Sequence, residues 1–128
     1  VATLRVRWFA AFAKIERVCV MKHVRGGALV KLMIETAVDM IGRKGYRHVL
    51  GYIQKRLVPF WKQLGFQPRL GRDGFRFSDY DYVECYRELA ARNDAITMES
   101  DPFVVMRPEG EWDEENVLDR SAARPAVA

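Results

Sequence analysis

The sequence contains little of what metal and disulfide sites need. Its 128 residues include only two cysteines and two histidines, and the spacing of Cys19 and Cys85 matches no metal-binding pattern. We therefore expect no metal ion, and two reduced thiols in a cytoplasmic protein. The sequence also lacks internal repeats, a signal-peptide pattern and any apolar run near the roughly 18 residues that a membrane span requires. These absences exclude a repeat architecture and a membrane-spanning protein.

The composition is typical of one globular domain, and its charge is unevenly distributed. Hydrophobic residues make up 49% of the chain and charged residues 30%. Residues 1–76 carry 16 Lys+Arg and 4 Asp+Glu, a net charge of +12, whereas residues 77–128 carry 5 and 13, a net charge of −8. The cationic part could bind a polyanion, a phosphorylated cofactor or an acidic protein, or the two parts could simply attract each other across the fold.

Hydrophobic periodicity predicts an α/β fold with a mixed, partly parallel sheet flanked by helices. A strand, a helix and a strand follow one another after residue 14, and this order indicates a crossover between parallel, adjacent strands. The sequence predicts a domain over residues 1–89 and an acidic extension over 90–128 that packs on it and has a frayed end. The expected elements are strands over residues 1–8, 15–21, 49–53, 75–78, 82–89 and 102–107, and helices over 26–44 and within 55–66.

Both expected helices carry local start and stop signals. Gly45 follows the longer helix as a residue with left-handed backbone should, and the shorter helix has Pro59 in its first turn. Gly65 should end the shorter helix, with Phe66 folding back on its last turn. The apolar stripe of the longer helix is expected to consist of Leu29, Met33, Ala37, Met40 and Ile41.

A turn with two glycines joins the second strand to the longer helix. Gly26 and Gly27 let the backbone approach a ligand closely, and the unpaired N–H groups at the helix start attract anions. Lys22, His23 and Arg25 add positive charge. A pyrophosphate fits this pattern, although a tight strand-to-helix turn without a ligand would look the same. No Gly-Lys-Ser/Thr follows, so the turn is unlike a P-loop.

Two motifs resemble the GNAT superfamily of acyl-CoA N-acyltransferases. The family's phosphate motif, Q/R-x-x-G-x-G/A, matches R-G-G-A-L-V from Arg25, with Ala28 and Val30 where glycines are usual. A second register, H-V-R-G-G-A, starts two residues earlier at His23 and keeps the glycine at Gly26, but it loses the first motif residue, and its spacing to the flanking elements follows the family less well. The family's N-x-x-A-x-x-x-Y-x-x-x-G-F motif aligns with residues 54–66, with Gln54 at the asparagine place, Leu57 at the alanine place and Trp61 at the tyrosine place, and only Gly-Phe at the end matches outright. The resemblance covers residues 1 to about 89.

The resemblance implies a set of cofactor contacts. The backbone of residues 18–20 would hold the pantetheine arm of an acetyl-CoA or another acyl-CoA, and residues 25–30 its pyrophosphate. Gln54, Phe60 and Trp61 would flank the thioester, although both aromatic residues could equally belong to the core. The implied contact residues are Val18, Cys19, Val20, Arg25, Gly26, Gly27, Ala28, Leu29, Val30, Gln54, Phe60 and Trp61. The first strand and first two helices of the family are missing here, so either residues upstream of Val1 belong to the natural protein or the protein is unusual within the family.

A general base must take a proton from the attacking amine, and Glu16 is the best candidate. Family members often have a glutamate at this place in the strand. By alternation, Glu16 should share one face with Val18 and Val20, with Cys19 on the opposite face. The alternative for Glu16 is an ion pair with Lys14 or Arg17. His23 and His48 are weaker candidates.

The expected activity is the transfer of an acyl group, in the first place acetyl, from acyl-CoA to a primary amine of a small molecule or a protein. An alternative within the family is a synthase of long-chain N-acyl amino acids or autoinducers that uses acyl-CoA or an acyl-carrier protein. A third possibility is a non-catalytic module that binds a CoA ester or a protein partner. We expect no nucleic-acid partner because no motif for one is present. A homodimer is compatible with the sequence.

Overall fold

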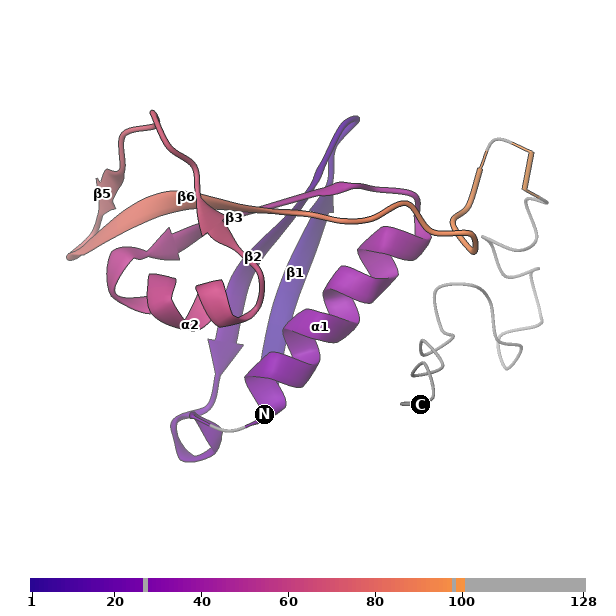
Figure 1. Cartoon of the computed structure of the whole chain (residues 1–128). Coiled ribbons are helices and arrows are strands. Elements are labelled where there is room, and N and C mark those ends of the chain that lie inside the picture. The colour runs from indigo at the N-terminus through magenta and orange to yellow at the C-terminus, as the bar shows by residue number, and fades with distance from the viewer. Residues whose placement is uncertain (27, 98, 101–128) are drawn as a thin grey trace.

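The described part of the chain forms a mixed six-stranded sheet with two α-helices (Figure 1). The computed structural model describes residues 1–26, 28–97 and 99–100. The strand order is β1-β2-β3-β6-β4, and β5 pairs with β6 off this path. Strands β2 and β3 are parallel and the other described pairs are antiparallel, so the predicted fold class is confirmed. The elements are β1 (Ala2–Trp8), β2 (Ala13–Val20), the 3-10 turn η1 (Lys22–Val24), α1 (Ala28–Arg43), β3 (His48–Gln54), the 3-10 turn η2 (Lys55–Leu57), α2 (Val58–Gln63), β4 (Gln67–Pro68), β5 (Phe75–Phe77) and β6 (Tyr80–Glu88).

One hydrophobic core joins both helices to one face of the sheet. Along β3 the residues alternate, with Val49, Gly51 and Ile53 buried and the residues between them more exposed. Burial of these apolar side chains is the main favourable term in folding. The core cluster consists of Ala13, Ile15, Ile34, Ala37, Val38, Ile41, Val49, Ile53, Trp61, Leu64, Phe66 and Cys85.

Strand β2 contains a β-bulge that the sequence did not predict. Thr3 of β1 pairs with Cys19, and Arg5 pairs with Glu16, so a step of two residues in β1 matches a step of three in β2. Arg17 lies in this irregular stretch with φ 53°, in the left-handed region that non-glycine residues seldom adopt. An extra residue of this kind shifts the side-chain alternation of the strand by one position.

The bulge overturns the expected distribution of side chains on β2. Ile15 is buried before the bulge, and Val18 packs against the same core after it. Glu16 therefore does not share a face with Val18 and Val20, as simple alternation predicted. The pairing with β1 places Glu16 on the same face as Cys19, which is exposed. The prediction that these two side chains point in opposite directions is wrong because it assumed an unbroken period of two.

Helix α1 occupies the predicted place and ends as predicted. Gly45 has φ 90°, its N–H donates to the carbonyl of Gly42 at 2.9 Å, and the N–H of Tyr46 donates to the carbonyl of Ile41 at 3.3 Å. These two bonds are those of a Schellman motif, which satisfies carbonyl groups at the end of a helix. The first described helical residue is Ala28, two positions later than expected.

The buried stripe of α1 differs in part from the predicted one. Ala37 and Ile41 are buried as expected, but Ile34 and Val38 complete the buried face. The remaining members of the expected stripe are half-buried. The face of α1 that packs on the sheet is rotated about the helix axis by about one residue from the face that we expected. Those three, Leu29, Met33 and Met40, line a shallow apolar groove beside β1.

Helix α2 confirms the local signals at its two ends. Pro59 lies in its first turn, where the missing N–H of proline has no cost. Gly65 has φ 81°, and the N–H of Phe66 donates to the carbonyl of Trp61 at 3.1 Å. The Phe66 ring then packs edge-on against Trp61, with ring centroids 5.0 Å apart. The short turn η2 that precedes α2 was not predicted.

Strands β5 and β6 form the predicted hairpin, with a tighter turn than expected. Phe77 pairs with Tyr80, so the turn consists of Ser78 and Asp79 only, and Ser78 has φ 55°. Strand β4, which pairs with β6, was not predicted because two residues carry too little pattern to be recognised.

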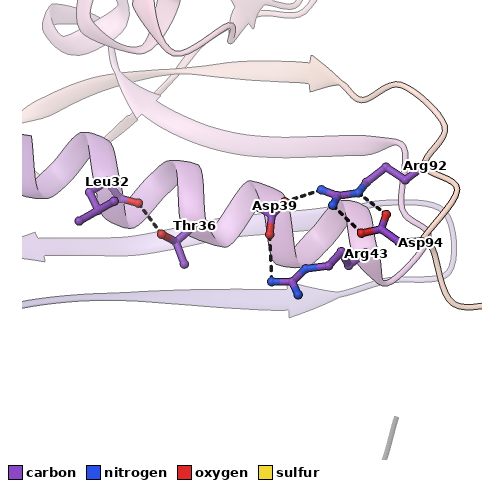
Figure 2. Close-up of polar contacts among 6 residues, drawn as sticks. All are labelled: Leu32, Thr36, Asp39, Arg43, Arg92 and Asp94. Carbon is purple, nitrogen blue, oxygen red and sulfur yellow. Dashed lines mark hydrogen bonds and ion pairs between the residues drawn. The ribbon is translucent and has the colours of Figure 1, made fainter. Parts of the chain in front are cut away.

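The segment after β6 contacts the last turns of α1 (Figure 2). Arg92 donates to Asp39 and forms an ion pair with Asp94 at 2.7 Å, while Arg43 lies 3.0 Å from Asp39. The N–H of Ile96 donates to the carbonyl of Arg43 at 2.9 Å. These contacts fix the path of the chain beyond the sheet. The strand predicted over residues 102–107 lies outside the described residues. Within the described residues, neither helix is long and apolar enough to cross a membrane.

Candidate active site

The sheet has a gap between its two parallel strands, β2 and β3. Strands β2 and β3 pair only through Ala13 with Val49 and Lys14 with Leu50. Beyond these pairs the two strands diverge towards their carboxyl ends (Figure 1). Strand β3 remains paired with β6 over its whole length. Backbone groups that face the gap from β2 and β3 therefore have no strand opposite them, and they are available to a ligand with complementary groups.

The gap leads to the turn at the start of α1. Strand β2 is followed by η1 and then by Arg25 and Gly26, which has φ 80° and open space around its Cβ position. The Nε of Arg25 donates to the carbonyl of Val20 at 3.0 Å, so two predicted cofactor residues are in contact. The first N–H groups of α1 have no intrahelical acceptor, and the positive end of the helix dipole adds to them. Gly27 lies outside the described residues.

The predicted cofactor residues of β2 lie along one edge of the gap. Cys19 and Val20 pair with Thr3 and Ala2 of β1, which fixes the backbone of this stretch. Val18 packs on the core and the Cys19 side chain is exposed. A contact through backbone groups, as the resemblance implied, does not depend on which face each side chain occupies.

Glu16 lies in a cluster of cations on the face of the sheet opposite the core. It accepts a hydrogen bond from Arg5 Nε at 2.6 Å, and it lies 3.2 Å from Lys14 Nζ and 3.9 Å from Arg7 Nε. Burial alone would raise the pKa of Glu16, but hydrogen bonds from Arg5 and Lys14, and their charges, outweigh it and lower the pKa below its ordinary value. The ion pair with Lys14 that we considered as an alternative is therefore present, and Glu16 is a weak base.

The three residues predicted beside the thioester differ in their surroundings. The Oε1 of Gln54 accepts from Arg56 Nε at 2.8 Å, and its Nε2 lies 3.5 Å from the Tyr82 hydroxyl. Phe60 is half-buried, and its ring lies edge-on to Trp61 with centroids 6.4 Å apart. The side chain of Trp61 is 7% exposed and belongs to the core cluster. The structure thus brings these residues to the end of β3 and the helix that follows it.

Sequence reasoning missed the polar residues of β6 near the gap. Tyr82 pairs with Gln54, and Glu84 pairs with Tyr52, so strand β6 adds a hydroxyl and a carboxylate next to β3. The signal in the sequence is the alternation of Tyr80, Tyr82 and Glu84 along one strand. Within the described ranges, no group of three His, Cys, Asp or Glu side chains could hold a metal ion.

No family model matches the sequence, and no curated protein matches it either. Solved structures do match. A protein from Lactobacillus plantarum, described as an N-acetyltransferase, aligns with a TM-score of 0.65 and 19% identity over 70% of this chain and 61% of its own. An acyl-CoA N-acyltransferase from Pseudomonas aeruginosa aligns with a TM-score of 0.60 and 21% identity over 67% of this chain and 59% of its own. A GNAT family acetyltransferase from Elizabethkingia anophelis with acetyl-CoA bound has a TM-score of 0.58 and 10% identity over 70% and 69% of the two chains.

This chain has the GNAT fold. The resemblance drawn from the two motifs is thereby confirmed at the level of the fold. The chain spans about 60% of the length of the first two matches, by the shares of 61% and 59%. The gap between β2 and β3 lies beside β2, and β2 leads through η1 and Arg25 to the start of α1, so these features follow one another along the chain.

Proposed function

We propose that this GNAT-fold chain binds an acyl-CoA along the gap between β2 and β3 and transfers its acyl group to a primary amine. The proposal rests on one observation: β2 and β3 pair through only two residue pairs and then separate, and β2 leads into a glycine turn and the start of α1. The acetyltransferase from Elizabethkingia anophelis, which holds acetyl-CoA, and the N-acetyltransferase from Thermoplasma acidophilum, which holds coenzyme A, share the fold. Their ligands support an acyl-CoA as the co-substrate, and we place the reaction in the cytoplasm.

The reaction needs few groups from the protein. The amine attacks the thioester carbonyl carbon, the C–N bond forms and the C–S bond breaks. The ammonium group loses two protons in all, and the departing CoA thiolate takes up one. A backbone N–H of β2 that faces the gap would stabilise the oxyanion. Glu16 would accept a proton, directly or through water, although its paired state makes it a weak base.

The residue at the usual place of the general acid cannot serve as one. Trp61 is buried, and its indole N–H does not release a proton in the relevant pH range. A thiol with a pKa near 8.5 can leave as the thiolate without help. This feature favours a second candidate function, in which the chain binds a CoA ester but transfers no acyl group. Turnover of acetyl-CoA with an amine separates the two candidates.

The phosphate site is tested by placing negative charge at the helix start. We expect the double variant Arg25→Glu with Ala28→Glu to lower CoA affinity at least 100-fold in calorimetry, because two carboxylates would repel the pyrophosphate. The glutamate of Ala28→Glu would lie in the first turn of α1, where a carboxylate favours the helix, so we expect the double variant to remain folded although it loses the bond from Arg25 to Val20. Thr36→Glu is the control for the Ala28→Glu half of the pair, since it adds the same single negative charge at an exposed position of α1 two turns further on. Unchanged CoA affinity in the folded double variant would rule out this site.

A further inference from the structure

A charged cleft lies on the face of the sheet opposite the core. Lys14 and Tyr52 alternate with buried core residues along their strands, so they point to this second face. The cleft has a volume of about 510 Å³. Side chains from the β1–β2 turn, from β2, β3 and β6, and from the loop after β4 line it. Those that carry the argument are Phe9, Phe12, Lys14, Tyr52, Arg69 and Glu84.

The cleft begins beside the gap between β2 and β3. Lys14 belongs to the last residue pair before the gap, and Tyr52 follows on β3 on the same face. Tyr52 pairs with Glu84, and the N–H of Arg69 donates to the carbonyl of Glu84 at 2.9 Å. Because neighbouring strands lie about 4.8 Å apart, these three residues form a row that leads away from the gap. A molecule in the cleft could thus reach a thioester held in the gap.

The cleft carries more positive than negative charge. Lys14 is paired with Glu16, and Arg72 lies 3.3 Å from Glu84, whose side chain is only 9% exposed. Arg69 has no acidic partner among the described residues, and its guanidinium lies over the Tyr86 ring at 5.4 Å from the centroid. The cleft therefore offers one carboxylate beside a cation that has no neutralising acid. This arrangement suits a molecule with both a positive and a negative group.

One wall of the cleft is apolar. Phe9 and Phe12 stack on each other with ring centroids 4.6 Å apart, at the turn that joins β1 to β2. Leu50 also lines the cleft. Stacked rings present a rigid apolar surface, which is suited to an aliphatic or aromatic group of a ligand.

Resting on the proposed function, we propose that the acyl acceptor is an amine that carries a carboxylate and an apolar side chain, as an apolar α-amino acid does. Glu84 binds the ammonium group, and Arg69, together with Arg72, binds the carboxylate. The side chain of the acceptor packs on Phe9 and Phe12. After deprotonation, the nitrogen forms the C–N bond with the acyl carbon as the C–S bond breaks, and the products are an N-acyl amino acid and CoA.

Two probes that differ by one group test this acceptor class. L-phenylalanine and 2-phenylethylamine differ only in the carboxylate, and their dissociation constants can be measured by calorimetry on the CoA-saturated chain. We expect L-phenylalanine to bind 10- to 100-fold more tightly, because hydrogen bonds to a charged group have this worth. Arg69→Gln should reduce the difference, because only Arg72 then remains for the carboxylate, and it should leave 2-phenylethylamine unaffected. Arg76→Gln is the matched control, since Arg76 is exposed on the β5–β6 hairpin and pairs with Asp81.

The results distinguish this proposal from the proposed function. Equal affinities for the two probes, or an equal loss of both in Arg69→Gln, would overturn the acceptor class while CoA binding stayed intact. Absence of CoA binding in a separate titration would instead overturn the proposed function. Circular dichroism melting of Arg69→Gln shows whether the variant is folded, and a folded variant with an undiminished preference for L-phenylalanine would remove Arg69 from the site.

Discussion

Replacing Trp61 by alanine separates its two roles, in the core and beside the cofactor. The Trp61 side chain is 7% exposed and packs on Phe66. A buried tryptophan removes about 200 Å² from water, which corresponds to about 5 kcal/mol at 25 cal/mol per Å². This area is an upper estimate because the unfolded chain is itself partly compact. We therefore expect Trp61→Ala to lower the free energy of unfolding by about 3–5 kcal/mol.

The effect on cofactor binding is the decisive measurement. If α2 flanks the thioester, the cavity left by Trp61→Ala also weakens CoA binding, whereas Trp61→Tyr keeps or raises acyl transfer, because a phenol can protonate the thiolate. Urea denaturation gives the stability, and calorimetry with CoA gives the affinity, on the same variant. Trp8→Ala is the control, since Trp8 is 39% exposed and lies at the far end of β1 from the helix start. A Trp61→Ala variant that is much less stable but binds CoA as tightly as the parent would refute the assignment of α2 to the pocket.

Two further predictions concern charge and backbone conformation. Because its pKa is lowered, Glu16 should contribute stability above pH 4.5, its ordinary value, and lose it as the pH falls through the lowered value. The stability difference between Glu16→Gln and the parent in urea should thus be present at pH 7 and decrease as the pH falls below 4.5, and a difference that did not change with pH would contradict the ion pairs. If Glu16 is the base, turnover in Glu16→Gln should also fall roughly 10²-fold. Gly65→Ala should cost about 1–2 kcal/mol through its positive φ, and more than Gly71→Ala, because its Cβ would lie 3.2 Å from Arg87 whereas that of Gly71 meets nothing within 4 Å. Equal costs in urea denaturation would show that Arg87 yields freely.

Local signals predicted much of the fold. Pro59, Gly45 and Gly65 each act within one turn of helix, so their effects could be read from the residues on either side. The prediction that the second and third strands are parallel neighbours followed from the length of the helix between them, although the pairs form through Ala13 and Lys14, just before the predicted strand 15–21. These features depend on the local preferences of proline and glycine and on the length of a segment, and both can be read from the sequence.

The chemistry of the site was harder to predict because it depends on register. Nothing in the residue type of Arg17 indicates a left-handed backbone, yet this one conformation decides which of the later β2 residues share a face with Glu16. Of the cations around Glu16, Lys14 is close to it in sequence, but Arg5 lies on the neighbouring strand β1 and could not be identified without the register. The contact between Arg69 and Glu84 likewise requires the chain to return along β6.

Only two residue pairs join β2 to β3, so the sheet consists of two hydrogen-bonded units. One is the hairpin of β1 and β2, and the other consists of β3, β6 and the short strands. Across the boundary the units share little backbone hydrogen bonding, so their cohesion rests on the side chains of α1 that pack against both. Weakly joined units open at lower free energy than the whole domain. A ligand lying along both edges of the gap would bridge them, so that occupancy and the rigidity of the whole sheet would rise together.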